Sequence, residues 1–372
     1  MKTLTFCNNC IAFSTRPRIS FNKEGVCSAC QWSHEKKKLN WNVRQKELSL
    51  LLKKNKFNKS KYDCIVPVSG GKDGSYVAYK LKHKFKMNVL TITVRPPLET
   101  KLGIENLNSF IKSGYSHMHI SPDDEAMRTL NRIGFEKMGF PYYGWLISIH
   151  TAIMKAATMM KIPLIVYSED GEIEYGGDTK YKNKSTYSID YQISHYLEGG
   201  YNKIINLAKK NGISESQLYW FKFPSKQELE SNKIRVTHFS YFENWDPYRN
   251  YVIAKEKCGL KERETLSQGS YTNFAQIDQE LYPLHVYLMY LKFGFGRTTQ
   301  DACIDVRRGS MTRKQAIELA KRYDDFFPSE YFKKYANYYK ISESRFHKII
   351  DKWVNKKLFV KKKKWVPKFK IR

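Results

Sequence analysis

The chain has 372 residues, of which 41% are hydrophobic, and a formal net charge of +29. This length suits about two to three compact units with a sizeable core, so the composition excludes a disordered or fibrous chain. The N-terminus has no apolar leader, and His150 and Lys155 interrupt the most apolar long window well short of the ~18 residues of a membrane span. We therefore expect a cytoplasmic protein without a membrane span.

Two segments, 36–61 and 356–372, concentrate the positive charge. Clustered lysines can replace the counterions around phosphates, but they can equally form a solvated face or a docking surface for an acidic partner. The charge pattern alone leaves these three interpretations open. Nucleic acid is not the partner that we expect.

Four of the seven cysteines form two short pairs, Cys7 with Cys10 and Cys27 with Cys30. Two C-x2-C pairs separated by 16 residues have the spacing of a four-thiolate zinc site. Because sulfur fills all four positions of such an ion, the metal is structural and closed to substrate. The sequence therefore predicts a zinc ribbon over residues 1–35, held together by Zn²⁺.

A basic connecting helix is expected over residues 36–60, where apolar residues recur at roughly helical intervals. These residues are Leu39, Val43, Leu48, Leu51 and Leu52.

Residues 61–180 alternate between buried strands and helices, which predicts an α/β domain with a parallel sheet and helices on both faces. The expected strands are 62–68, 87–94, 115–120 and 162–168, and the expected helices are 74–84, 103–114, 121–139 and 144–161. Residues 181–372 are rich in tyrosine and in helical patterns. We expect them to form a mainly α-helical region that binds substrate or partner and ends in a basic tail.

The first predicted strand passes directly into the sequence SGGKDGS, residues 69–75. A strand that ends in Ser-Gly-Gly at a helix start exposes backbone N–H groups that can cradle an oxyanion. Lys72 and the Ser75 hydroxyl can add donors, and Asp73 can hold Mg²⁺. The spacing is neither that of a Walker loop nor that of a dinucleotide-binding loop.

SGGKDGS resembles the PP-loop of the ATP pyrophosphatase superfamily, whose usual form is SGGxDS; this chain has Gly74 at the serine position and Ser75 one step later. The resemblance implies an adenine-nucleotide-α-hydrolase-like fold and the use of ATP with Mg²⁺, by cleavage between the α and β phosphates. The residues expected to bind the nucleotide are Ser69, Gly70, Gly71, Lys72, Asp73, Gly74, Ser75 and Val94.

Four further blocks resemble the N-acetyl sugar amidotransferase family of bacterial surface-polysaccharide and lipopolysaccharide pathways, in which pseudaminic- and legionaminic-type sugars occur. They are RPRISFNKEGVCSAC (16–30), GEIEYGG (171–177), YLKFGFGR (290–297) and DACIDVRRGSMTRKQAIEL (301–319). The resemblance implies an ATP-dependent enzyme that converts the acetamido group of a sugar or nucleotide sugar into an acetamidino group. The amide oxygen is adenylated, with release of pyrophosphate, and ammonia then displaces AMP.

Five residues are candidates for the catalytic step. Lys72 and Asp73 lie in the PP-loop, Glu172 and Glu174 lie in an acidic loop after the last predicted strand, and Arg297 follows two glycines. The acidic loop can bind magnesium, orient a sugar or deprotonate ammonium, or it can be a solvated turn. Arg297 can contact a substrate anion or simply follow a helix terminus.

No glutaminase signature occurs in the sequence, so ammonia must come from another protein. The resemblance implies separate partners similar to the glutaminase and cyclase subunits of imidazole-glycerol-phosphate synthase.

Two alternative functions remain open at this point. A PP-loop tRNA thiolation enzyme fits the positive charge, but such enzymes generally need further paired cysteines, and Cys64, Cys258 and Cys303 form no pair. A non-catalytic nucleotide- or RNA-binding module is supported only by Gly74 in the PP-loop.

Overall fold

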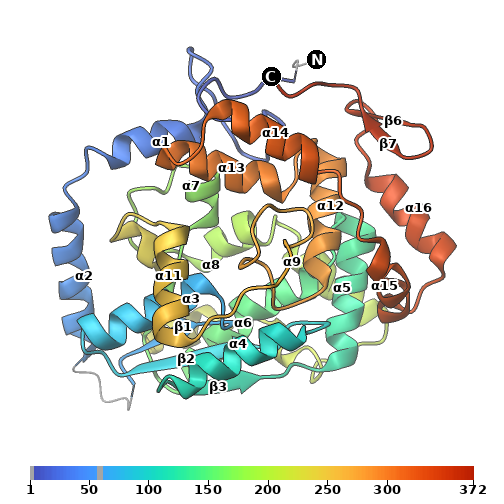
Figure 1. Ribbon diagram of the computed structural model, residues 1–372. Coiled ribbons are helices and arrows are strands. Elements are labelled where there is room, and N and C mark those ends of the chain that lie inside the picture. Colours follow the sequence, from blue (N-terminus) through green and yellow to red (C-terminus); the bar gives the residue numbers. More distant parts are fainter. Residues whose placement is uncertain (1–3, 57–61) are drawn as a thin grey trace.

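The computed structural model describes residues 4–56 and 62–372, and the end of the predicted basic helix lies outside these residues. Its centre is a five-stranded parallel sheet in the order β3-β2-β1-β4-β5 (Figure 1). The strands are β1 (Cys64–Pro67), β2 (Val89–Val94), β3 (Ser116–Ile120), β4 (Leu164–Tyr167) and β5 (Arg235–His238). The chain therefore builds outward from β1 to β3 and then returns to the other side of β1 for β4.

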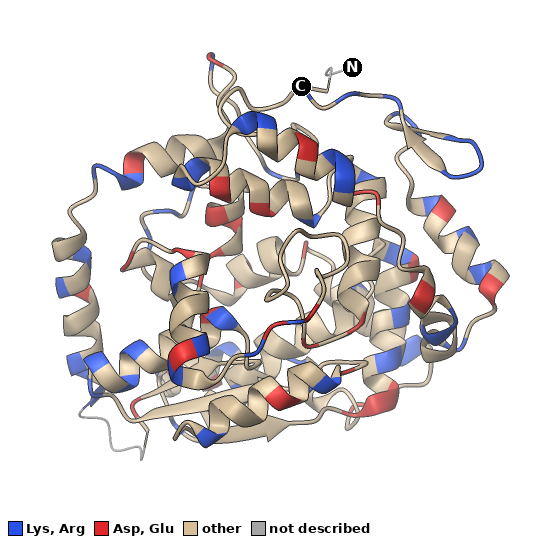
Figure 2. Cartoon of the chain, in the orientation of Figure 1, with Lys and Arg blue, Asp and Glu red and all other residues tan. Residues whose placement is uncertain are grey.

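The segment before the sheet contains the ribbon and two helices, α1 (Ser28–Lys36) and α2 (Trp41–Lys56), whose basic residues are visible in Figure 2. The connecting helix expected over 36–60 corresponds to α2, which begins at Trp41, later than predicted. Residues 37–40 separate it from α1, because the Asn40 side chain accepts a hydrogen bond from the Asn42 N–H and starts a new helix. Of the predicted inward residues, Leu48 and Leu52 are buried, whereas Val43 is 50% exposed.

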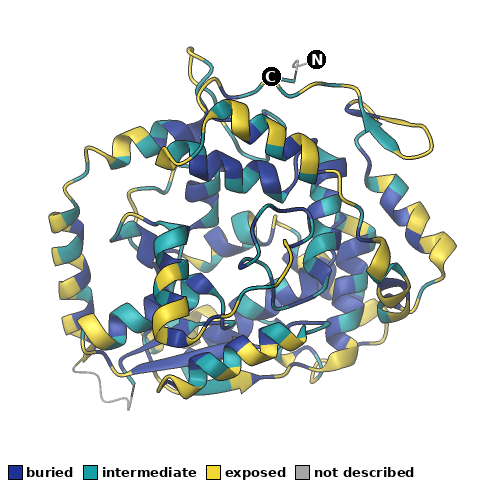
Figure 3. Ribbon diagram, in the orientation of Figure 1, coloured by how far each residue is buried: buried dark blue, intermediate teal, exposed yellow. Residues whose placement is uncertain are grey.

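The two faces of the sheet pack against different helices. The strands β1, β2 and β4 are largely buried, whereas the edge strand β3 is partly exposed (Figure 3). Side chains alternate along a strand, so Cys64 and Val66 face one core while Ile65 faces the other. The helices on the Cys64 side are α3 (Lys72–Tyr79), its π-helical extension (Lys80–Lys84), α4 (Lys101–Lys112) and α11 (Pro247–Cys258). The helices on the Ile65 side include α5 (Asp124–Met138), α6 (Tyr143–Met159), α9 (Tyr201–Lys210) and α12 (Leu281–Phe293).

The edge strand β5 was not predicted. It pairs with β4 through Ile165 opposite Val236 and Val166 opposite Thr237. The predicted boundary near residue 180 therefore does not mark the end of the sheet. A run of four residues is too short to show a reliable period of two, and helical patterns surround this one.

Beyond β4 the chain is mainly helical, as predicted. The remaining helices are α7 (Gly171–Tyr175), α8 (Ile189–Tyr191) with its π-helical extension (Gln192–Tyr196), α10 (Lys226–Ser231), α13 (Arg297–Arg308), α14 (Arg313–Tyr323), α15 (Phe332–Tyr339) and α16 (Glu343–Trp353). The basic tail contains an unpredicted antiparallel hairpin of β6 (Phe359–Lys361) and β7 (Trp365–Pro367). Single helical turns also occur at Tyr219–Phe221, Phe239–Tyr241 and Ser329–Tyr331.

This arrangement confirms the predicted fold class. It has a parallel sheet with helices on both faces, an N-terminal four-cysteine segment and a helical C-terminal region. None of the helices formed by residues 4–56 and 62–372 is long and apolar enough to cross a membrane.

Candidate active site

The turn between β1 and α3 is shaped by glycine. Gly70 has a φ of +77°, and a Cβ at this position would lie 2.5 Å from the Leu107 backbone nitrogen on α4. Gly71 is extended and precedes α3 without a side-chain cap. The N–H groups in the first turn of α3 have no intrahelical partners, so they and the helix dipole are available to an anion.

Gly74, which occupies the serine position of the PP-loop, lies against the first strand. A Cβ at Gly74 would come within 2.7 Å of the Pro67 carbonyl oxygen, so glycine allows α3 to sit close to β1. Ser75 does not supply the missing hydroxyl to the cavity beside this turn. Its side chain is buried, its Oγ has no hydrogen-bond partner among the described residues, and it packs on the side of the neighbouring core.

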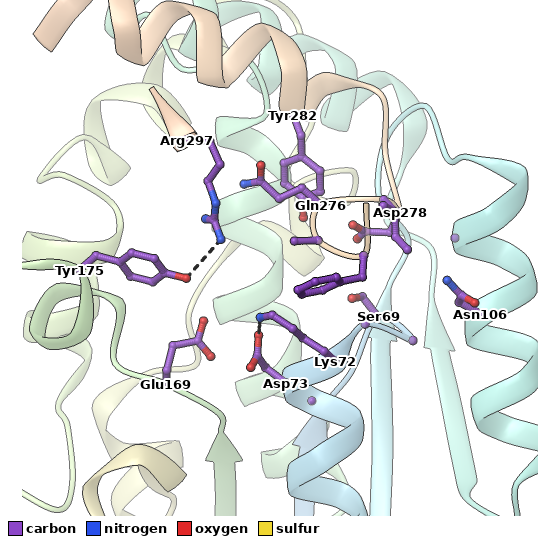
Figure 4. Close-up of a pocket in the computed structure, with 17 residues that line it drawn as sticks. Ser69, Lys72, Asp73, Asn106, Glu169, Tyr175, Gln276, Asp278, Tyr282 and Arg297 are labelled. Atoms are coloured by element: carbon purple, nitrogen blue, oxygen red, sulfur yellow. Dashed lines mark hydrogen bonds and ion pairs between the residues drawn. The ribbon is translucent and has the colours of Figure 1, made fainter. Parts of the chain in front are cut away.

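A cavity of about 270 Å³ opens where the carboxyl ends of β1 and β4 diverge. This is the point at which the strand order reverses, and ligands of open α/β sheets bind at such points. Residues from the turn after β1, the segment after β4, the helices α3, α4, α7, α12 and α13, and the segment before α12 converge on it (Figure 4). Its polar lining includes Ser69, Lys72, Asp73, Asn106, Glu169, Tyr175, Gln276, Asp278, Tyr282 and Arg297.

Lys72 and Asp73 form an ion pair at the floor of this cavity. Burial disfavours the charged form of Lys72, which is 8% exposed, but Asp73 raises its pKa, so the ammonium is retained. Asp73 is held in place from the other side, because its Oδ1 accepts hydrogen bonds from Trp245 Nε1 at 3.2 Å and Asn250 Nδ2 at 2.8 Å. The Asp73 carboxylate is therefore held by three donors, Lys72, Trp245 and Asn250.

Two further carboxyl groups face the cavity. Burial, reinforced by the negative charge of Asp73, raises the pKa of Glu169 to about 7. Burial also raises the pKa of Asp278 to about 6, and its Oδ2 has no hydrogen-bond partner among the described residues. Carboxylate oxygens are suitable ligands for Mg²⁺, so Asp73 fits a magnesium ion in this cavity.

Arg297 brings a cation to the opposite wall. It begins α13, pairs with Asp301 at 2.9 Å and donates a hydrogen bond to the Tyr175 hydroxyl at 3.3 Å (Figure 4). Gly294 caps the C-terminus of α12 in the left-handed conformation. The sequence FGFGR therefore forms a helix terminus, and this terminus places the arginine at the cavity.

The structure separates the predicted catalytic residues into two groups. Lys72, Asp73 and Arg297 line the cavity, whereas Glu172 and Glu174 do not. The expected acidic loop is the short helix α7, in which Glu172 pairs with Arg18 at 2.6 Å and Glu174 pairs with Lys36 at 2.7 Å. Both acids thus hold the N-terminal segment against the sheet domain.

Val94, a predicted nucleotide-binding residue, ends β2 and lies in the hydrophobic core, where its carbonyl accepts a hydrogen bond from Trp145 Nε1 at 3.1 Å. The sequence placed Glu169 in the acidic segment but did not single it out. Tyr175 lies in the block GEIEYGG but was not singled out, and Asp278 and Trp245 gave no local signal, because no motif surrounds them.

The four N-terminal cysteines are buried, and their sulfurs lie within 4.8 Å of one another. Cys7 Sγ is 3.8 Å from Cys30 Sγ, and Cys10 Sγ is 3.7 Å from Cys27 Sγ. A tetrahedral ion with Zn–S bonds of about 2.3 Å holds its sulfurs about 3.8 Å apart. A cluster of several iron atoms would hold them farther apart, because each thiolate binds a different iron. The geometry fits a single metal ion.

Residues 268–371 match the family model described as LPS biosynthesis protein WbpG-like, C-terminal domain. This match is consistent, over this region, with the predicted resemblance to a family of lipopolysaccharide pathways. The matched region contains α12, α13 and the cavity residue Arg297, together with two of the blocks on which the prediction rests.

One curated relative is the uncharacterized protein MJ1599 of Methanocaldococcus jannaschii, which is 34% identical over 101 residues. The match covers 27% of this chain and only 36% of that protein's length.

Two solved structures are similar over larger parts of the chain. The U34-tRNA thiolase NcsA from Methanococcus maripaludis, with its 4Fe-4S cluster, has a TM-score of 0.33 and 15% identity and covers 83% of this chain and 88% of its own. The NH3-dependent NAD synthetase from Campylobacter jejuni, in complex with nitrate, has a TM-score of 0.29 and 13% identity and covers 56% of this chain and 99% of its own. TM-scores this low do not show a shared fold, so the fold is described from the strand order and register of this chain itself.

Proposed function

We propose that this protein is an ATP-dependent amidotransferase that converts the N-acetyl group of a sugar into an acetamidino group. The observation that carries the proposal is the cavity at the strand-order reversal, where an uncapped helix start meets Lys72, Asp73, Glu169 and Arg297. The match of residues 268–371 to a lipopolysaccharide-biosynthesis domain supports a surface-polysaccharide sugar as the acceptor.

The turn after β1 suits the departure of pyrophosphate. The acetamido oxygen attacks the α-phosphorus of ATP, the bond from this phosphorus to the bridging oxygen breaks, and pyrophosphate leaves into the backbone cradle at Gly70 and Gly71. Lys72 and Arg297 offset the negative charge that develops on the phosphates. Mg²⁺ held by Asp73 would shield the same oxygens.

The second step needs ammonia as the free base. Ammonia attacks the activated carbon, the carbon–oxygen bond breaks and AMP leaves with the former amide oxygen. When ammonium arrives instead, Glu169 can take its proton, since a carboxyl with a pKa of about 7 suits a general base near neutral pH. After AMP leaves, the product is the protonated amidine, which keeps the protons of the attacking ammonia on its nitrogen atoms.

Zn²⁺ is the metal that we assign to the four cysteines, in a structural role. Ammonia is supplied by a separate glutaminase that acts with a cyclase-like subunit in the cytoplasm. In support, the described residues that line the cavity include no cysteine or serine–histidine pair that could hydrolyse glutamine.

The rival function, tRNA thiolation, is disfavoured by the same lining. Cys64, Cys258 and Cys303 are at most 4% exposed and do not line the cavity. A sulfur carrier would have to reach the activated carbon from outside. Replacing these three cysteines by serine should leave product formation intact.

The proposal is tested by incubating the full chain with ATP, Mg²⁺, ammonium and a panel of diacetamido sugars. We expect AMP and pyrophosphate, together with a sugar whose mass reflects the exchange of an oxygen atom for an NH group. Release of ADP, or AMP formation without any dependence on sugar, contradicts the proposal.

A further inference from the structure

A second large cavity lies beyond Trp245, outside the site described above. Its volume is about 350 Å³, and it is formed by the end of α1, the start of α2, residues 244–246 and α13. Four cations line it, namely Lys36, Lys37, Arg307 and Arg308, together with the indole rings of Trp41 and Trp245.

The ion pairs of this cavity leave positive charge in excess. Lys36 pairs with Glu174 at 2.7 Å, and Arg308 pairs with Asp246 at 3.0 Å. Among the described residues, Lys37 and Arg307 make no ion pair with a carboxylate. The cavity therefore has the electrostatic character of an anion site.

Arg307 also carries an unsatisfied donor. Its Nη2 donates to the Glu174 carbonyl at 2.8 Å, whereas its Nη1 is buried and has no hydrogen-bond partner among the described residues. A buried N–H without an acceptor costs about 1–3 kcal/mol, so such groups call for an explanation. Burial disfavours the charged form of Arg307, but the thiols of Cys10, Cys303 and Cys30 lie close enough to raise its pKa, and an anionic ligand would supply the acceptor that its Nη1 lacks.

Trp245 lies between this cationic cavity and the cavity beside Gly70 and Lys72, the nucleotide cavity of the proposed function. A narrow space of about 20 Å³ shares Lys72, Tyr175 and Arg297 with the nucleotide cavity and shares Trp245 with the cationic cavity. It has room for one small group and none for a sugar ring. The indole of Trp245 also donates to Asp73 at 3.2 Å, so one side chain contacts both sites.

We propose that the cationic cavity binds the anionic end of the acceptor sugar, a phosphate or carboxylate group, while the acetamido arm passes Trp245 to reach the nucleotide. This inference rests on the proposed function, because it assigns the acceptor of the same reaction. Lys37 and Arg307 contact the anion, and the flat faces of Trp41 and Trp245 pack against the sugar. The segment after the ribbon and the C-terminal region then act together, since each supplies residues to the lining of the cationic cavity.

The test is a calorimetric titration of the full chain saturated with a non-hydrolysable ATP analogue and Mg²⁺, which keeps phosphate groups out of the PP-loop. The probes are N-acetylglucosamine 1-phosphate, N-acetylneuraminic acid and neutral N-acetylglucosamine. We expect one of the charged sugars to bind at least about tenfold more tightly than the neutral sugar. Preference for the first assigns a phosphate, and preference for the second assigns a carboxylate.

Lys37→Glu tests the location of the anion, and Lys38→Glu is the matched control because Lys38 is exposed and does not line the cavity. The first variant should weaken binding of the charged sugar about five- to tenfold, and the second should leave it unchanged. Equal affinities for charged and neutral sugars, or equal losses in the two variants, overturn the inference. The titrations involve no turnover, so ADP release in the product assay overturns only the proposed function.

Discussion

The two cavities on either side of Trp245 handle negative charge in different ways. The nucleotide cavity presents the backbone of Gly70 and Gly71 beside one buried lysine, and its carboxylates reduce the net charge. The cationic cavity has no glycine turn, and side chains from three distant segments supply its charge. A backbone cradle is fixed by one short stretch of sequence, whereas a side-chain cluster exists only when the whole chain has folded.

This difference implies different sensitivities to mutation. A single substitution at the turn should disrupt the backbone cradle, because Gly70 and Gly74 lie so close to neighbouring backbone that there is no room for a side chain. The cationic cavity should lose affinity for its ligand when any of the segments that line it is displaced. The predictions below separate these two behaviours.

The largest effect is expected for Asp73→Asn. This change removes the carboxylate that pairs with Lys72 and that would hold Mg²⁺, so the rate of AMP formation should fall about a hundred- to a thousandfold. Pyrophosphate release measures the rate, and Asp190→Asn, at an exposed position, is the control. Similar rates for wild type and Asp73→Asn would show that the cradle is not the nucleotide site.

Loss of the ribbon metal should affect the cationic cavity more than the nucleotide cavity. The buried cysteines pack against Ala302 and Ala316 of α13 and α14, so Cys10→Ser should release the metal and loosen α1. We expect acceptor affinity to fall more than about tenfold while binding of the ATP analogue persists. Metal analysis and the two titrations measure this, and equal loss of both ligands would contradict the division between the cavities.

The pH dependence should identify the base. Glu169 must be deprotonated to accept a proton, and its pKa is raised to about 7, so activity should be lost as the pH falls through that value. When rates are normalised to ammonium, they should be level above this pH and fall about tenfold for each further pH unit below it, whereas Glu169→Gln, which depends on free ammonia alone, should show no level region. A level region that persists in the variant would assign the proton transfer to another group.

The smallest effect is expected at the wall between the cavities. Trp245→Phe keeps an aromatic ring but removes the indole donor to Asp73, while Asn250 remains at 2.8 Å. The value of kcat should fall about three- to tenfold with little change in KM for the acceptor. A rise in KM at constant kcat would show instead that Trp245 serves only in acceptor binding.

Much of the fold was predictable because its signals are local. The strands and helices of 61–168 carry strong periodicity, and the cysteine spacing gave the metal site. The short strand β5 was missed because four residues show no clear period. Glu172 and Glu174 were misplaced because sequence does not reveal that Arg18 and Lys36, about 150 residues earlier in the chain, would pair with them.

The cavity residues Asp278 and Trp245 were missed for a related reason. Each lies in an irregular segment between helices, and only the packing of the C-terminal region on the sheet brings them to Lys72 and Asp73. Lys72, Asp73 and Arg297 could be predicted because a motif surrounds each of them.

The central claim is that the acetamido oxygen is adenylated, and isotope transfer tests it most directly. A sugar whose acetamido oxygen carries a heavy isotope is converted with ATP, Mg²⁺ and ammonium, and the nucleotide product is analysed by mass spectrometry. We predict that the label appears in AMP. Label that remains in the sugar, or that appears in inorganic phosphate, would contradict the account.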